Sequence, residues 1–310
     1  MTKLSYFERG CRDLSVLLGM ATLFTFLSSY IWWAELFCHP RWQYSVLALL
    51  LMIAWVYCKK TKTAIFCAVL ALWHFSFLWP LLFGATTEAN EEGLISKVFL
   101  YNVYSPNDRY DDVLQYIKEE NPDFIVIEEV SPEWAKNLET LKKDYPFYKI
   151  VARSDNFGIA LFSKKKGKIR SVMLSASEVS TLVYENDQMI MIGTHPVPPI
   201  SGEYARWRNE QLLNLTDLAK QNNDKAVLLV GDLNLTPYSP YFTKILKDGE
   251  LISSTTGQGN LMTWPTQMPF LGAPLDHVLH SKHYQTISRK TGKDLGSDHW
   301  PVIVELQKVN

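Results

Sequence analysis

The feature that most constrains this 310-residue chain is a group of three long uncharged runs in its first third. No Asp, Glu, Lys or Arg occurs from Leu14 to Ala34, from Trp42 to Cys58 or from Thr63 to Thr87. A helix needs about 20 mostly apolar residues, within a usual range of about 17–25, to cross about 30 Å of hydrocarbon. The runs therefore predict a transmembrane anchor at 1–87, with spans at about 14–34, 42–58 and 63–83.

Aromatic residues near the ends of the runs support this prediction. Trp and Tyr gather where an interfacial belt would place them, at Trp32, Trp33, Trp42, Tyr44, Tyr57 and Trp79. Three buried helices of a water-soluble protein are the alternative. A cleaved signal peptide is disfavoured, because the first run is long and two more follow it.

The basic residues indicate an orientation. Lys3, Arg9 and Arg12 precede the first run, and three lysines lie between the second and third, whereas the first connection offers only Arg41. The positive-inside rule then places the N-terminus in the cytoplasm. We expect a multi-pass protein of the cytoplasmic (inner) membrane, with a linker at 88–94 and an extracytoplasmic (periplasmic) domain at 95–310.

The rest of the chain has a different pattern, in which strands and amphipathic helices alternate. Helices are predicted at about 108–120, 133–142 and 202–221. Strands are predicted near 97–103, 123–127, 147–151, 158–163, 169–174, 179–184, 188–194, 226–230, 275–280 and 301–306. So many strands, with helices on either side, predict an α/β (α+β) sandwich of two sheets flanked by helices.

Charge and cysteine content restrict the function of this second part. All four cysteines precede residue 68, so no disulfide stabilises the domain and its core must do so. Basic and acidic residues nearly balance after residue 94, whereas a nonspecific nucleic-acid binder is normally basic. The composition therefore disfavours a DNA-binding function without excluding it.

Polar residues recur where the predicted strands end, which is where α/β proteins gather their functional sites. They are Asn102, Glu128, Glu129, His195, Asp232, Asn234, Asp276, Asp298 and His299. Taken singly, each has a structural explanation as a helix cap, a turn residue or a satisfied histidine. Oxygen ligands without cysteine favour a hard ion, so the set predicts Mg²⁺, with Mn²⁺ as the alternative, rather than structural zinc.

The motifs that contain these residues occur in a characteristic order. They are Asn102, Ile127-Glu128-Glu129-Val130, Gly193-Thr194-His195, Gly231-Asp232-Leu233-Asn234, Asp276-His277-Val278 and Ser297-Asp298-His299-Trp300-Pro301. The set resembles the endonuclease/exonuclease/phosphatase superfamily, which includes pancreatic deoxyribonuclease, neutral sphingomyelinases and inositol polyphosphate phosphatases. The resemblance runs from about Lys97 to Leu306. Together with the three runs it more narrowly resembles membrane-anchored bacterial members.

The resemblance implies a role for each residue. Glu129 falls on the metal-binding glutamate, with Asn102 and Asp298 beside the same ion. Asp232 would align or deprotonate the attacking water, and Asn234 would donate a hydrogen bond to that water or to the phosphate. The remaining catalytic residues are His299, oriented by Asp276, and His195, which would face the phosphate. Whether His299 acts as base, acid or phosphate clamp stays open.

Three further residues are ambiguous. Glu128 stands where the family usually has glutamine, and either perturbs Glu129 or points into the fold. Arg208 is a predicted substrate contact, although a solvated helix face is an equal alternative. Trp264 is predicted to stack on the substrate, with a buried loop anchor as its alternative.

The predicted function is a membrane-anchored, metal-dependent phosphoesterase that hydrolyses its substrate by in-line attack of water. The expected partners are a lipid bilayer and a phosphoester, and a phospholipid headgroup or small phosphodiester is favoured over nucleic acid. A nuclease acting on extracytoplasmic DNA or RNA is the alternative within the enzyme class. A catalytically idle domain that binds a phosphorylated ligand is the alternative of another class.

Overall fold

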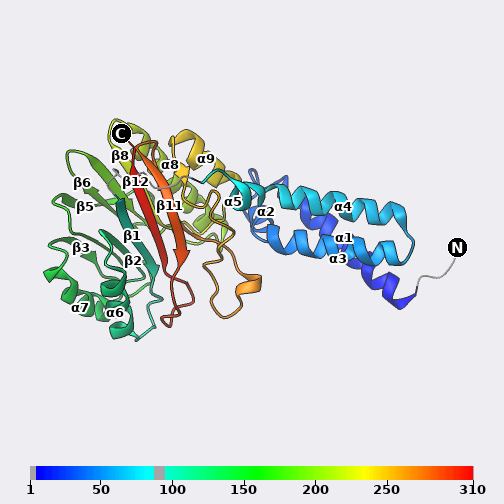
Figure 1. The fold of residues 1–310 in the computed structure, drawn as a ribbon, viewed down its shortest axis with the longest axis horizontal. Coiled ribbons are helices and arrows are strands. Elements are labelled where there is room, and N and C mark those ends of the chain that lie inside the picture. Colours follow the sequence, from blue (N-terminus) through cyan, green and yellow to red (C-terminus); the bar gives the residue numbers. More distant parts are fainter. Residues whose placement is uncertain (1–4, 87–94, 310) are drawn as a thin grey trace.

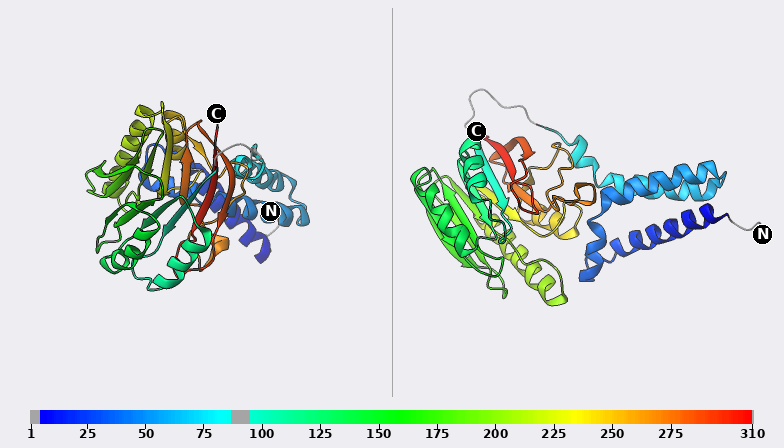
Figure 2. Two further views of the ribbon diagram at one scale, coloured as in Figure 1. Left: turned by 60° about the vertical axis from the view of Figure 1, so that its left-hand side comes forward. Right: turned by 90° about the horizontal axis from the view of Figure 1, so that it is seen from below.

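The computed structural model describes residues 5–86 and 95–309, and the linker predicted at 88–94 lies outside them. These residues form a helical N-terminal part and a part built on two β-sheets (Figure 1). The helices project from one side of the sheets (Figure 2). Three of them, α1 (Tyr6–Thr25), α3 (Arg41–Tyr57) and α4 (Thr61–Ser76), pack against one another.

The two sheets have six strands each. The first has the order β11-β12-β1-β2-β4-β3 and the second the order β5-β6-β7-β8-β10-β9. The strands of the first sheet, in that order, are Tyr284–Thr291, Val302–Lys308, Ile95–Asn102, Phe124–Glu128, Ile159–Ser163 and Phe147–Val151. Those of the second are Lys168–Met173, Ser180–Glu185, Met189–Gly193, Ala226–Asp232, Asp276–His280 and Ile252–Ser253.

The main core lies between the sheets. Alternate residues of each strand point to the same face, so Leu100 and Val126 of the first sheet pack with Leu228, Val230 and Val278 of the second. The sheets thus form a sandwich, as the sequence predicts.

Helices cover both outer faces of the sandwich. The first sheet packs against α6 (Tyr110–Glu120), α7 (Pro132–Leu138) and the short 3₁₀ helix η2 (Glu139–Lys143). The second packs against α8 (Gly202–Gln221) and α9 (Pro240–Asp248). Ser201 caps α8, because its side chain accepts a hydrogen bond from the backbone N–H of Tyr204, an interaction worth about 1 kcal/mol.

The prediction of three transmembrane helices is wrong. No helix in the described parts of the chain is long and apolar enough to cross a membrane. The predicted location in the cytoplasmic membrane rested on these spans, and it is corrected with them. The N-terminal part is a group of helices in place of the predicted transmembrane anchor.

The reason is that an uncharged run need not be one continuous apolar helix. Helix α1 carries charged residues in its first turns and ends at Thr25, and the run continues through a turn into α2 (Trp32–Glu35) and the 3₁₀ helix η1 (Leu36–Cys38). With 16 residues at about 1.5 Å each, α4 is about 24 Å long. It is followed by a break and by α5 (Trp79–Phe83).

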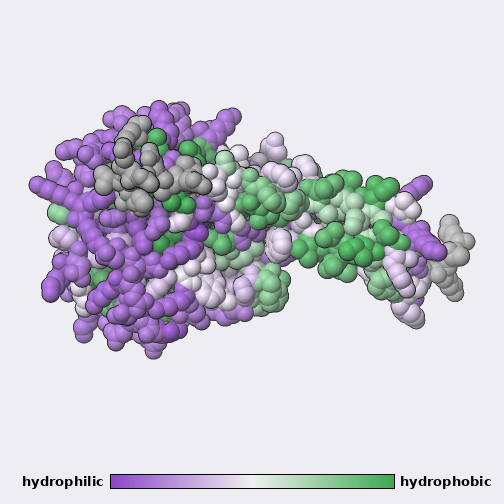
Figure 3. All heavy atoms as spheres, viewed as in Figure 1, coloured by the Kyte–Doolittle hydropathy of each residue, from purple (hydrophilic) through white to green (hydrophobic). Residues whose placement is uncertain are grey.

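The surfaces of the two parts differ. Figure 3 shows apolar residues over the projecting helices and mostly hydrophilic residues over the sandwich. The exposed apolar side chains of the helices include Leu17, Leu23, Leu50, Ile53 and Leu72.

Candidate functional site

The candidate site lies at one edge of the sandwich, where strands from both sheets meet. Strands β1, β2, β7 and β8 end at this edge, and β10 and β12 begin there. The residues that follow or start these strands line a hollow of about 530 Å³. Its polar lining includes the predicted residues Asn102, Glu129, His195, Asp232, Asn234, Asp298 and His299.

Strand register brings the key carboxylates together. Strands β8 and β10 are antiparallel, and Asp232 lies directly opposite Asp276. Strands β1 and β2 are parallel, and Asn102 is paired with Glu128. Directly opposed side chains on neighbouring strands have Cβ atoms about 4.5–5.5 Å apart. Residues far apart in the sequence are thereby fixed in one place by backbone hydrogen bonds.

One end of the site is organised around His299. Its Nδ1 lies 2.9 Å from Oδ2 of Asp276, and its Nε2 lies 3.5 Å from Oδ2 of Asp232. Burial by itself lowers the pKa of His299, but the carboxylates of Asp276 and Asp232 outweigh it and raise the pKa to about 10. The imidazole is therefore protonated at neutral pH, and Nδ1–H donates to Asp276.

For Asp232, burial has a larger effect on the pKa than the neighbouring charge has. Burial raises the pKa of Asp232 to about 7, although the nearby His299 lowers it. Its backbone N–H lies 3.1 Å from each carboxylate oxygen of Glu128, and its Oδ1 accepts the backbone N–H of Asn234 at 2.9 Å. Asp232 is thus rigidly held and suited to accept a proton near neutral pH.

Glu128 supports the site from behind. Its side chain is fully buried, and burial followed by the charges of Asp232 and Asp276 raises its pKa well above the usual range for a carboxyl group. The Glu128 side chain also packs close to the backbone at position 231. A Cβ there would come within 1.8 Å of the Thr194 carbonyl oxygen and 2.8 Å of Glu128 Oε1, so only glycine fits at this position. These contacts agree with the interpretation that Glu128 points into the fold.

His195 and Asn234 flank Asp232. Nε2 of His195 lies 3.7 Å from Oδ2 of Asp232. Burial, with a smaller effect of His299, lowers the pKa of His195 to about 3 and keeps the ring neutral. Asn234 lies in the left-handed region (φ 52°), and its amide donates to the Pro196 carbonyl at 2.9 Å. Its predicted hydrogen bond to water or phosphate stays a prediction.

The other end of the site contains Glu129 and Asp298. Glu129 accepts hydrogen bonds from Asn102 Nδ2 and from the backbone N–H of Ser105, both at 3.1 Å. Asp298 accepts one from the indole Nε1 of Trp264 at 3.0 Å. Burial raises the pKa of Glu129, despite the opposing hydrogen bonds from Ser105 and Asn102.

This end fits a divalent cation. Neither Glu129 nor Asp298 forms an ion pair with a Lys or Arg among the described residues, and none of the residues lining the hollow is basic apart from histidines. Two carboxylates with no Lys or Arg paired to them among the described residues, one of them with a raised pKa, match the oxygen donors that Mg²⁺ and Mn²⁺ bind. Asn102 turns its Nδ2 toward Glu129, while its Oδ1 accepts the N–H of Tyr104. Its role as a ligand stays a prediction.

A closer acidic group also exists, but it is less suited to a metal. One ligand atom each of Asp232, Asp276 and His299 lie within 4.8 Å of one another. The hydrogen bond between His299 and Asp276, together with the raised pKa of His299, already supplies these carboxylates with a positive charge. We therefore assign this trio to proton handling.

The two predicted substrate contacts have different surroundings. Trp264 lines the hollow and is 40% exposed, so it is available to a substrate. Arg208 does not line the hollow. It is fully buried, paired with Glu35, and donates through Nη1 to the Asn234 carbonyl at 3.2 Å. This placement replaces the predicted substrate contact with a structural role behind the site.

Among the lining residues that sequence reasoning missed, Leu36 and His39 come from the N-terminal helices. No local motif marks them. The one sequence feature that could have indicated a contact between this segment and the rest of the protein was Glu35, a lone acidic residue directly after an uncharged run.

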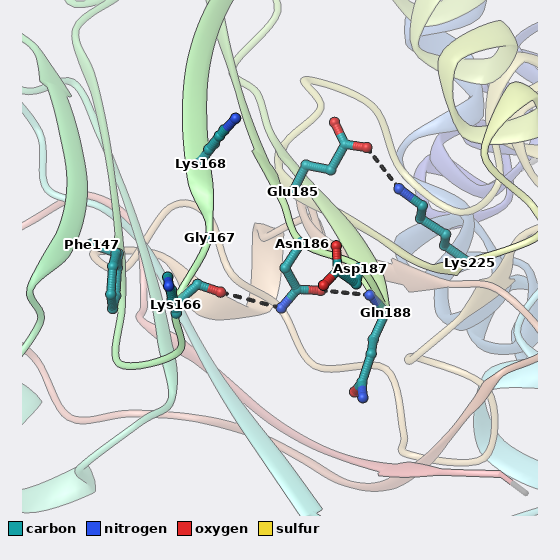
Figure 4. Close-up of a pocket in the computed structure, with 9 residues that line it drawn as sticks. All are labelled: Phe147, Lys166, Gly167, Lys168, Glu185, Asn186, Asp187, Gln188 and Lys225. Carbon is teal, nitrogen blue, oxygen red and sulfur yellow. Dashed lines mark hydrogen bonds and ion pairs between the residues drawn. The ribbon is translucent and has the colours of Figure 1, made fainter.

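A larger hollow of about 710 Å³ lies at the opposite ends of β6, β7 and β8 (Figure 4). Its charged side chains partly satisfy one another, as in the 2.8 Å ion pair between Lys225 and Glu185. None of the motif residues lines it. Its position and lining separate it from the candidate site.

The family assignment follows from the fold and the site together. The model of the endonuclease/exonuclease/phosphatase family matches residues 99–299, about two thirds of the chain. The chain belongs to this family. The match begins in β1 and ends at His299, so it includes every predicted catalytic and metal-binding residue but not the N-terminal helices. A search of curated protein sequences found no match.

Solved structures support the same fold at low sequence identity. An endonuclease/exonuclease/phosphatase from Bacteroides vulgatus is 18% identical, with a TM-score of 0.58 over 70% of this chain and 100% of that one. Sphingomyelinase C from Streptomyces griseocarneus is 20% identical, with a TM-score of 0.53 over 70% and 100%. D. rerio TDP2 complexed with a single-strand DNA product is 15% identical, with a TM-score of 0.54 over 68% and 98%.

Proposed function

We propose that this protein is a divalent-metal-dependent phosphoesterase, with Mg²⁺ as the ion and Mn²⁺ as its substitute. The observation that carries the proposal is the division of one hollow into two chemically different ends. Protonated His299 beside Asp232 forms one end, and Glu129 with Asp298 forms the other. Family membership supports hydrolysis at phosphorus as the reaction class.

The proposed reaction is a direct displacement. Asp232, whose pKa is about 7, accepts a proton from water as the water oxygen bonds to phosphorus. The bond between phosphorus and the leaving oxygen breaks on the opposite side. Protonated His299 then donates a proton to that leaving oxygen, and Asp276 holds the imidazole in position as carboxylates do in other hydrolases.

The metal end has a separate task. A bound divalent ion neutralises a phosphate oxygen and the charge that develops in the transition state. Glu129 and Asp298 would hold it, with Asn102 as a further predicted ligand. Trp264 would fix the orientation of the Asp298 carboxylate through its indole N–H.

We favour a phospholipid headgroup or a small phosphodiester as the substrate. No Lys or Arg lines the hollow, whereas nucleic-acid sites normally neutralise several phosphates with basic side chains. The structural similarity to a sphingomyelinase supports this class. The similarity to TDP2, solved with a DNA product, keeps a nuclease as the second candidate.

A substrate panel tests the proposal. Purified protein with Mg²⁺ or Mn²⁺ is assayed on bis(p-nitrophenyl) phosphate, p-nitrophenyl phosphate, phospholipid vesicles, inositol phosphates, mononucleotides, and single- and double-stranded DNA. His299→Ala serves as the inactive variant and His283→Ala, which lies outside the hollow, as the matched control. We expect metal-dependent hydrolysis of a phosphodiester that His299→Ala loses and His283→Ala keeps. If the unmodified protein binds a phosphoester in a metal-dependent way but does not hydrolyse it, the result would favour the alternative of a catalytically idle domain that binds a phosphorylated ligand.

A further inference from the structure

The N-terminal helices reach the candidate site at one turn. The 3₁₀ helix η1 and the residue after it place Leu36 and His39 in the lining of the hollow, beside residues that follow β7. These two residues lie well outside the segment 99–299 that defines the family. The site of this chain therefore has a wall that the family domain alone does not provide.

The turn is fixed to the sandwich by buried polar contacts. Glu35 is fully buried, accepts a hydrogen bond from Ser239 Oγ at 2.6 Å and pairs with the guanidinium of Arg208. Nδ1 of His39 lies 3.0 Å from Oγ1 of Thr236. Breaking a buried ion pair leaves a buried charge without its partner, which is strongly destabilising, so these contacts hold the turn in place.

The same contacts connect the turn to the segment that follows β8. Arg208 donates through Nη1 to the carbonyl of Asn234, two residues after Asp232. The N-terminal wall and the proton-accepting carboxylate thus share one support. Their relative position is set by these contacts.

The wall is apolar and uncharged. Leu36 is 42% exposed and Ile200, which also lines the hollow, is 71% exposed. Burial, reinforced by Arg208, lowers the pKa of His39 to about 4, so its ring is neutral. Exposed apolar side chains from two distant segments, beside a charged end that suits one phosphate, leave a place for a hydrocarbon group.

We propose that Leu36 and the turn 36–39 form a specificity wall that binds a hydrocarbon arm attached to the reacting phosphate. This inference rests on the proposed phosphoesterase function and narrows its substrate class to phosphoesters with an apolar arm. A second phosphate finds no basic partner on this wall, so the wall selects against polyanionic substrates.

The test uses p-nitrophenyl alkyl phosphodiesters with methyl, butyl and octyl arms, below their aggregation concentrations and with Mg²⁺ or Mn²⁺. Leu36→Ser is compared with the full-length wild type and with Leu213→Ser, a control on α8 of similar exposure (47%) outside the hollow. We expect kcat/KM of the wild type to rise with arm length, by up to about fourfold for each methylene removed from water.

We expect Leu36→Ser to lower the octyl-to-methyl ratio of kcat/KM by about fivefold or more, and Leu213→Ser to keep the wild-type ratio. Hydrolysis of the methyl ester with no dependence on arm length, or equal ratios for the two variants, would overturn the specificity wall alone. Failure to hydrolyse any of the esters with either metal would overturn the proposed function, and the wall with it.

Discussion

The two ends of the candidate site contain similar residues but balance their charges differently. At one end, Asp232 and Asp276 lie against a histidine whose pKa they raise to about 10. At the other, Glu129 and Asp298 have only neutral hydrogen-bond donors, and burial raises the pKa of Glu129. The first end holds its cation in direct contact, whereas His299 acts on Glu129 and Asp298 only through longer-range attraction.

This difference separates two functions that the motifs alone do not distinguish. Buried charges persist when they are paired or when they coordinate metals. The end with a built-in cation can move protons without an ion, whereas at the other end a bound cation would offset the charge of Glu129, whose pKa is raised by burial. Under the proposed function the same residue type, aspartate, would therefore serve proton transfer at position 232 and metal binding at position 298.

The largest effect is expected from a substitution that removes the imidazole of the proton-handling end. His299→Ala should lower kcat by about 10²–10⁴-fold, because a positioned acid or base contributes that much. Metal affinity should stay unchanged, because the ion belongs to the other end. Single-turnover assays on bis(p-nitrophenyl) phosphate at saturating Mg²⁺ measure the rate. Activity that survives in both His299→Ala and Asp232→Asn would show that the reaction occurs elsewhere.

A smaller effect is expected from the residue that orients Asp298. Trp264→Phe keeps an aromatic ring at the site but removes the indole N–H that Asp298 accepts. Loss of such a supporting hydrogen bond typically costs 10–100-fold in metal affinity or activity, and we expect about tenfold in the Mg²⁺ concentration needed for half-maximal rate. Rescue of the rate at high Mg²⁺ would locate the defect in metal binding. An unchanged Mg²⁺ requirement would remove Trp264 from the metal end.

The smallest expected effect is on the stability of the metal-free protein. A carboxyl group with a raised folded-state pKa binds more protons when folded, so its contribution to stability falls as pH rises above its ordinary range. Glu129→Gln has no charge to bury and should gain stability relative to the wild type between pH 5 and pH 8. We expect a relative Tm increase of roughly 2–4 °C, measured with a chelator present.

The control for that experiment is the same pair of proteins with excess Mg²⁺. The wild type should then recover its stability, because the ion offsets the buried carboxylates and binds only the folded state. A constant Tm difference at all pH values would mean that Glu129 needs no counter-charge.

The fold of the sandwich was predictable where hydrophobic pattern and capping residues agree. The helix predicted at 202–221 matches α8, which begins after its cap Ser201. Strand β11 was missed because it lies at the edge of its sheet and six of its eight residues are polar. Helix α9 was missed although Ser239 and Pro240 are a typical start, as its nine residues are short for a periodic pattern.

The site was partly predictable for a different reason. The order of the motifs indicated that Asp232, Asp276 and His299 act together, and strand register brings them together. Pairings between distant parts of the chain left no local signal. The burial of Arg208 depends on Glu35, 173 residues away, so a helix residue expected to face the substrate instead lies behind the segment that follows β8.

The prediction of transmembrane helices failed because a count of uncharged residues does not show where a helix ends. The uncharged run from Leu14 continues past the end of α1 at Thr25, and the run that contains α4 is broken before Trp79. Counting uncharged residues therefore overestimated the length of the apolar helix in the first and third runs, whereas α3 has the 17 residues of the span predicted at 42–58, shifted by one position.

The most direct test of the central claim is a metal-binding titration of three proteins, because it asks which end of the site needs an ion. Mn²⁺ binding to the wild type, Glu129→Gln and His299→Ala is measured by calorimetry and by the loss of the free Mn²⁺ electron paramagnetic resonance signal. We predict that the wild type and His299→Ala bind with the same affinity and that Glu129→Gln binds at least about tenfold more weakly. Equal affinity of the wild type and Glu129→Gln, or a loss of binding confined to His299→Ala, would contradict the division of the site into a metal end and a proton-handling end.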